Sequence, residues 1–365
     1  MKLLIQPEHG VGSLIKEIDG ARKSIEIAIF RFDHVDIERA LERAVDRGVS
    51  VHALIANTNH GEEKNLRKLE MDLLPLGVEV SRTADDLRRH HYKFMIVDRR
   101  VLHLLTFNYT HLDVEHSRSF GLVIDDPDAV EEAARLFYAD VRRQTYKPKL
   151  KSFVVSPINA REQLSHFIKG ARKQLLIYDP EISDRAMIHL LRDRARNGVE
   201  IRIIGRVAKP SGDFDPGRLM RMRFHTRAIF RDRREAFLGS QSLKEAELDK
   251  RRELGMIVRD HDIVRSLVKV FESDWAGLVP AHEVSRKDAA EGAKVLKKAV
   301  KAIVRELPLA PIVQAALEHA VGEVPSFELR GNELRHKLTD AVKEAVEDAV
   351  AGIVRRGTAA TASQV

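Results

Sequence analysis

The pattern of apolar and polar positions predicts that the chain contains two copies of one structural unit. Residues 20–55 align without a gap on residues 170–205, and both stretches begin with the letters GARK. Each contains an apolar run, a segment with apolar residues at helical spacing, a glycine and a second apolar run. The apolar positions of the two predicted helices are Ile37, Leu41, Ala44 and Val45 in the first copy, and Ile188, Leu191 and Ala195 in the second.

This order of runs predicts a strand, a helix and a second strand in each copy. The first strands are expected at 25–30 and 175–178, and each helix should stop at a glycine, Gly48 or Gly198. Because such units pack helices onto a sheet, we expect an α/β fold in which each half has its own sheet flanked by helices. The first copy is longer and includes one more helical stretch, 62–76.

The repeat divides the chain into predicted domains. We place the first α/β domain at 1–148 and the second at 149–280. Apolar stripes opposed by lysines predict a helical extension over 281–356, and TAATASQV falls in a disordered tail at 357–365. The extension could pack on itself or the core, form a dimer contact, or lie on an anionic membrane as a Lys-rich amphipathic helix.

Composition narrows the function classes without choosing one. The 365 residues lack cysteine, which excludes disulfides and thiolate chemistry, and no run approaches the roughly 18 apolar residues of a membrane span. We therefore expect a soluble, cytoplasmic protein. The net charge of +7 suggests an anionic partner such as a phosphate compound, a nucleic acid or an anionic lipid.

The candidate chemistry lies in a short motif that occurs once in each copy. HYKFMIVD occupies 91–98 and HTRAIFRD occupies 225–232. Side chains two apart on a strand share a face, so each histidine should project beside a cation, while His90 should face solvent. The aspartate that ends each motif suits a turn. The motif residues are His91, Lys93 and Asp98 in the first copy, and His225, Arg227 and Asp232 in the second.

Small polar residues follow each motif at matching positions, Thr106 and Asn108 in the first copy, Ser240 and Ser242 in the second. If the halves pack about a pseudo-twofold axis, two histidines and two cations converge on one cleft with these groups around it. Such a site suits a phosphodiester. One imidazole attacks phosphorus, the other protonates the leaving oxygen, and the cations stabilise the equatorial oxygens.

The duplicated motif resembles the H-x-K-x4-D motif of the phospholipase D superfamily, and the likeness extends over about residues 10 to 275. The resemblance implies two α/β/α sandwiches related by pseudo-twofold symmetry, a reaction without metal or cofactor, and a phosphohistidine intermediate. By family order His91 is the nucleophile and His225 the acid. Asp98 and Asp232 belong to the catalytic motifs, where they brace the site, and the small polar residues position the phosphate.

The sequence also departs from the family pattern. Arg227 replaces a lysine, Ser242 an asparagine, and Ser119 the glutamate that Glu253 provides in the second copy. We expect Glu253 to orient His225, which leaves His91 without a carboxylate unless Asp113 or Glu115 supplies one. A phospholipid is the favoured substrate and a nucleic acid the alternative, and the basic stretch 218–234 suits either. A third reading is a duplicated fold that binds phosphate ligands without turnover. The oligomeric state stays open.

Overall fold

The structure is a computed structural model, and it describes residues 1–57, 63–208, 218–219 and 223–280. Met1–His282 form one compact unit that contains both copies of the repeat. The predicted helical extension and tail lie outside the described residues. No helix of the described ranges is long and apolar enough to cross a bilayer.

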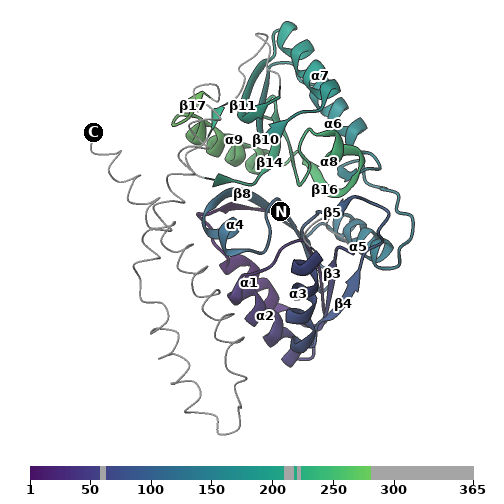
Figure 1. Cartoon of the computed structure of the whole chain (residues 1–365). Coiled ribbons are helices and arrows are strands. Elements are labelled where there is room, and N and C mark those ends of the chain that lie inside the picture. The colour runs from purple at the N-terminus through teal and green to yellow at the C-terminus, as the bar shows by residue number, and fades with distance from the viewer. Residues whose placement is uncertain (58–62, 209–217, 220–222, 281–365) are drawn as a thin grey trace, which may run out of the picture. The chain divides into compact units, whose positions relative to one another are not determined.

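The first half forms one sheet with helices on both faces (Figure 1). Its elements are β1 (Lys2–Gln6), α1 (Gly12–Gly20), β2 (Ser24–Ile29), α2 (Val35–Asp46), β3 (Ser50–Ile55), α3 (Glu63–Leu73), the 3-10 turn η1 (Leu74–Leu76), β4 (Glu79–Arg82), β5 (Arg89–His90), β6 (Phe94–Val97), β7 (Val101–Leu105), α4 (His111–Glu115), β8 (Ser117–Ile124) and α5 (Pro127–Val141).

The second half, from residue 153 onward, follows the same order except that α3 and η1 have no counterpart among its described residues and β17 is added. Its elements are β9 (Phe153–Ser156), α6 (Ala160–Lys169), β10 (Gln174–Ile182), α7 (Arg185–Arg196), β11 (Glu200–Val207), β12 (Arg218–Leu219), β13 (Arg223–Phe224), β14 (Arg227–Arg231), β15 (Glu235–Gly239), α8 (Glu245–Asp249), β16 (Arg251–Val258), α9 (His261–Trp275) and β17 (Val279–Pro280).

The strand orders of the two sheets confirm the duplication. The first sheet runs β1-β8-β7-β6-β2-β3-β4, and the corresponding strands of the second run β9-β16-β15-β14-β10-β11-β12. In both sheets the strand before the repeated helix is parallel to the strand after it, as the predicted strand, helix and strand require. The helices α2 and α7 stop before Gly48 and Gly198, whose φ angles of 81° and 83° favour glycine.

Three apolar clusters give the fold its layers. One packs α1, α2 and α3 on the first sheet, and a second packs α6, α7 and α8 on the other. The third is continuous between the halves, because it joins the opposite faces of both sheets to α5 and α9. Figure 1 shows α1, α2 and α3 on one side of β3 and β4, with α5 on the other. Each half is therefore an α/β/α sandwich, as predicted.

Candidate active site

Each motif histidine is carried to the junction of the halves by a strand that joins the opposite sheet. β5 of the first half pairs with β16 of the second, and β13 of the second pairs with β8 of the first. The backbone N–H of His91 donates to the carbonyl of Arg252 at 2.8 Å, and that of His225 donates to the carbonyl of Arg118 at 3.0 Å. This exchange of strands fixes both histidines against the other half.

The exchange also corrects the predicted local structure. His91 and Lys93 were expected on one continuous strand, but residues 91–93 lie in a break between β5 and β6. The chain leaves the second sheet at this break and enters its own. His90 is buried rather than solvent-facing, with Nδ1 3.1 Å from the hydroxyl of Thr83. The expectation for His90 was wrong because β5 is covered by both halves.

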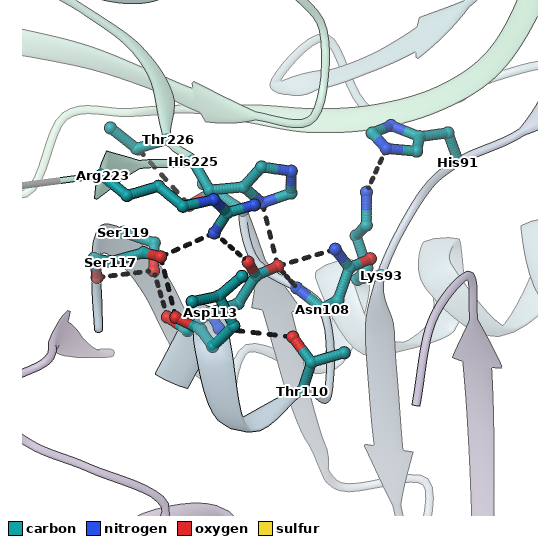
Figure 2. Close-up of polar contacts among 12 residues, drawn as sticks. His91, Lys93, Asn108, Thr110, Asp113, Ser117, Ser119, Arg223, His225 and Thr226 are labelled. Carbon is teal, nitrogen blue, oxygen red and sulfur yellow. Dashed lines mark hydrogen bonds and ion pairs between the residues drawn. The ribbon is translucent and has the colours of Figure 1, made fainter. Parts of the chain in front are cut away.

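The two predicted histidines do meet. Their ring centroids are 6.4 Å apart, and the rings are nearly perpendicular at 78°. Figure 2 shows His225 near Asp113 of α4, with His91 and Lys93 on the other side of the same site. The separation allows one phosphorus atom to approach both imidazoles, since reacting atoms begin about 3–3.5 Å apart.

His91 is held at both ring nitrogens. Nδ1 lies 2.9 Å from Oε2 of Glu253, and Nε2 lies 2.9 Å from Nζ of Lys93. With the Glu253 carboxylate as acceptor, Nδ1 carries the proton and Nε2 keeps its lone pair. Burial lowers the pKa of His91 well below its ordinary value, and the cations of Lys93 and Arg227 lower it further. The imidazole is thus neutral and presents a nucleophilic nitrogen to the junction.

His225 is held by a carboxylate of the first half. Its Nδ1 lies 3.1 Å from Oδ2 of Asp113. Burial lowers the pKa of His225 to about 4, against the opposing effect of the Asp113 charge. Burial would raise the pKa of Asp113, but His225, Arg223 and the backbone amide of Asn108 outweigh it and lower that pKa. Asp113 is therefore an anion beside His225, and it also accepts hydrogen bonds from Asn108 and Arg223.

These contacts correct the predicted pairing of histidines and carboxylates. Glu253 contacts His91 rather than His225, because β16 lies next to β5 and the chain that leads into His91. Asp113, considered as a partner for His91, contacts His225 instead. Glu115 contacts neither, since it lies near His34 and His111. Each histidine is thus oriented from the opposite half, and Asp113 supplies the carboxylate that Ser119 lacks.

The two predicted cations differ in their surroundings. Lys93 is 1% exposed, and burial lowers its pKa to about 7, although Glu253 opposes this effect. Its ammonium also lies 5.2 Å from the ring centroid of Phe30. The guanidinium of Arg227 instead donates from Nε to Ser242 Oγ at 3.2 Å, and from a terminal nitrogen to the His225 carbonyl at 3.0 Å. Lys93 therefore contacts its histidine ring, whereas Arg227 is held by its own half.

The four small polar residues fall into two pairs. Thr106 donates to the carbonyl of Phe120 at 2.9 Å and accepts from its amide at 3.0 Å. Ser240 makes the same two bonds to Leu254, at 3.3 and 3.1 Å. Both hydroxyls thus fasten the strand ends to β8 and β16. The second pair is different, because Asn108 donates to Asp113 and Ser242 accepts from Arg227.

Asp98 and Asp232 lie at the turns that end the two motifs. Asp98 accepts backbone N–H groups from Arg22, Lys23 and Ser24, and Asp232 accepts from the corresponding residues 172–174. Burial would raise the pKa of each carboxyl, but these bonds outweigh it and lower both. Asp98 thus braces the hairpin β6–β7 against the chain that enters β2. Asp232 braces the hairpin β14–β15 against the chain that enters β10.

Two buried ion pairs join the halves and were missed by sequence reasoning. Arg118 lies 2.8 Å from Asp274, and Arg252 lies 3.0 Å from Asp140. The pairs correspond under the repeat, and the two arginines are the residues whose carbonyls receive the histidine amides. Because these four residues occupy matching positions in the two copies, aligning the repeats could have predicted the two ion pairs.

A pocket of about 510 Å³ opens beside Asn108 and Asp113 on the side of the first half. Its wall combines apolar side chains with cations and anions. The lining residues are Phe30, Arg31, Phe32, Asp33, Glu38, Leu66, Lys68, Leu69, Asp72, Asn108, Thr110, Leu112, Asp113 and Arg223.

Part of the sequence is similar to known proteins. A mitochondrial cardiolipin hydrolase of Canis lupus familiaris is 30% identical over 137 residues, 37% of this chain and 50% of that protein. One from Mus musculus is 29% identical over 149 residues, 40% of this chain and 63% of that protein. The chain thus spans between half and two thirds of the length of these curated relatives.

Two solved structures share the fold. A polyphosphate kinase of Porphyromonas gingivalis has a TM-score of 0.62 at 19% identity, covering 74% of this chain and 46% of its own. A phosphatidylserine synthase of Haemophilus influenzae has a TM-score of 0.57 at 13% identity, covering 76% and 87%.

The family match confirms the duplication directly. The family described as "Cardiolipin synthase, PLD-like domain" matches residues 14–141 and again residues 164–275, which is more than half of the chain. The two matched segments contain the two motif histidines and their crossed carboxylates. The chain belongs to this family of phospholipase D-like proteins.

Proposed function

We propose that the chain is a phospholipase D-like phosphodiesterase that works through a phosphohistidine at His91. The observation that carries the proposal is the crossed arrangement, in which each of two adjoining imidazoles is held by a carboxylate of the other half. It leaves one imidazole neutral, with its Nε2 lone pair facing the Lys93 ammonium, and places the second beside an anion that stabilises its protonated form.

In the proposed first step Nε2 of His91 attacks phosphorus, and the bond from phosphorus to the leaving oxygen breaks. His225 gives its proton to that oxygen. Lys93 contacts Nε2 of His91 before substrate arrives, so its ammonium turns to a phosphate oxygen when the phosphodiester binds. Arg227 and the polar side chains of Asn108 and Ser242 stabilise the remaining negative charge.

The second step reverses the roles. His225 removes a proton from water or an alcohol, whose oxygen attacks phosphorus and displaces Nε2 of His91. Water gives hydrolysis and an alcohol gives transfer. Burial lowers the pKa of His225 to about 4 in the free protein, so the anionic phosphate must favour its protonated form when substrate binds. The negative charge of Asp113 acts in the same direction.

A phospholipid is the substrate that the surroundings favour. The pocket beside Asn108 and Asp113 combines apolar side chains with both cations and carboxylates, a mixed lining that suits an amphipathic molecule. A single-stranded nucleic acid would need surfaces on which bases stack, and the chain has one tryptophan and five tyrosines. The names of the curated relatives point in the same direction. The cytoplasmic location stays a prediction.

Turnover measured with EDTA present tests the proposal. The purified chain is assayed on cardiolipin and phosphatidylglycerol vesicles and, separately, on single- and double-stranded DNA. We expect phospholipid turnover that EDTA leaves intact and that His91→Ala removes. Cleavage of DNA alone would replace the substrate class. A folded wild type that binds vesicles without turnover would make the chain a binding protein and end the enzymatic proposal.

A further inference from the structure

The short helix α4 has a second set of chemical groups on the side away from the active site. Asp113 is buried and contacts His225, whereas the side chains of His111 and Glu115 are 59% and 41% exposed. His116 follows the helix directly. One ligand atom each from His111, Glu115 and His116 lies within 4.8 Å of the other two. The rings of the two histidines are 5.2 Å apart and close to parallel.

A buried histidine points at the same group. His34, the residue before α2, is 4% exposed, and neither of its ring nitrogens forms a hydrogen bond. Its Nε2 lies 3.4 Å from Oε1 of Glu115, while Oε2 of the same carboxylate lies 3.2 Å from Nε2 of His111. A buried imidazole without hydrogen bonds is costly, so its position calls for a partner. One carboxylate oxygen of Glu115 therefore faces His34, and the other is available to bind a metal ion.

We propose that His111, Glu115 and His116 bind one divalent transition-metal ion, with Zn²⁺ as the occupant. Two imidazoles and one carboxylate match the ligand preference of Zn²⁺, whereas Mg²⁺ and Ca²⁺ take oxygen ligands. Bonds to nitrogen of about 2.0–2.1 Å are shorter than the present spacing allows, so the exposed side chains must rotate to enclose the ion. His34 is a positioning residue, because its Nε2 lies 3.4 Å from the Glu115 oxygen that does not bind the ion.

The site is separate from the proposed reaction. Asp113 is buried against His225, whereas His111 and Glu115 are exposed on α4 and His116 follows the helix. The proposed ion takes no part in phosphate chemistry. Its effect would be structural, since it joins α4 to the start of β8 and, through His34, to α2. The backbone N–H of His111 already donates to Asp33 at 2.8 Å in the loop before α2. A ligand that binds only the folded chain raises its melting temperature.

Calorimetric titration of Zn²⁺ into the EDTA-stripped, dialysed full chain tests the proposal. We expect one saturable site in the wild type, and at least about tenfold weaker binding at that site in the double variant His111→Ala, His116→Ala. The control is His261→Ala, which removes an exposed histidine 3.6 Å from Asp262 and should leave the titration unchanged. Identical curves for wild type and double variant would overturn the proposal.

A second measurement separates metal binding from a fault in folding. Glu115→Gln keeps the size of the side chain and removes its charge, so it should fold while weakening Zn²⁺ binding. Co²⁺ in place of Zn²⁺ gives visible absorption bands that report direct coordination. We expect these bands in the wild type and in His261→Ala, and their loss in the double variant. Bands that persist there would show that the ion binds elsewhere.

Discussion

The two halves of the molecule share a framework but treat their catalytic groups differently. Both have the same strand order, the same aspartate at the hairpin turn and reciprocal ion pairs to the other half. At the site, the first half presents a neutral imidazole in contact with a buried ammonium. In the second half, the imidazole of His225 lies beside the Asp113 carboxylate, and the Arg227 guanidinium donates to the backbone carbonyl of His225.

This difference supports the separate roles that we propose for the two histidines. A nucleophile needs a lone pair and no positive charge, which burial and the neighbouring cations provide at His91. An acid needs a proton, which the anion Asp113 favours at His225. The crossing of Glu253 and Asp113 means that neither half is complete without the other. The framework tolerates this divergence because exchanged strands, two ion pairs and a shared apolar cluster also hold the halves together.

The largest contrast should appear when each imidazole is removed in turn. With a nitrophenyl phosphodiester, whose leaving group needs no proton, we expect His225→Ala to release one equivalent of nitrophenol in a burst and then stop. His91→Ala should give no burst, and its turnover should fall by about 10³-fold or more. Rapid-mixing absorbance measures both. Equal bursts from the two variants would break the assignment of roles.

The kinetic effects of replacing each carboxylate should follow the crossed pairing, in which Glu253 contacts His91 and Asp113 contacts His225. Glu253→Gln is expected to lower burst formation by about 10²-fold or more, because Nδ1 of His91 loses the acceptor that fixes its tautomer. Asp113→Asn should leave the burst and slow the later steps that need His225. Glu245→Gln, an exposed carboxylate on α8, serves as control. If Asp113→Asn slowed the burst and Glu253→Gln did not, Asp113 rather than Glu253 would be the partner of His91, and the crossed pairing would be wrong.

Anion binding through Lys93 should depend on pH. Burial lowers the pKa of Lys93 to about 7, so its ammonium is charged below that value and loses its charge above it. Sulfate keeps its charge throughout this range, and its affinity should fall by up to about tenfold per pH unit above pH 7. Calorimetry of Lys93→Met should show weaker binding without this step. An unchanged step in that variant would assign the titration to another group.

Exchange of the cations should have the smallest effects in the second half. Arg227→Lys restores the family residue at a half-buried position, and we expect kcat/KM to change by less than about tenfold. Lys93→Arg inserts a larger group into a fully buried position and should also lower stability by about 1–3 kcal/mol. Steady-state kinetics and urea unfolding measure both variants. A larger loss of activity and stability in Arg227→Lys than in Lys93→Arg would contradict the proposed contrast between the fully buried Lys93 and the more exposed Arg227.

The repeated pattern was sufficient to predict the architecture and the meeting of the histidines. Aligned strands, helices and glycines indicated a sheet in each half, and the matching motifs indicated one shared site. The partners of the histidines were not predictable in the same way, because β5 and β13 cross into the opposite sheet and are only two residues long. Without that crossing, Glu253 was assigned to His225. Asp113 was offered only as a partner for His91, because its contact with His225 depends on the same two strands that cross between the sheets.

The most direct test of this account identifies the residue that carries the covalent intermediate. The His225→Ala variant is mixed with the nitrophenyl phosphodiester, quenched in base, where phosphohistidine survives, and mapped by peptide mass spectrometry. Because water is not activated in this variant, the adduct should accumulate on His91 to about one per chain. A burst of nitrophenol with the adduct on any other residue, or with no adduct at all, would contradict the central claim.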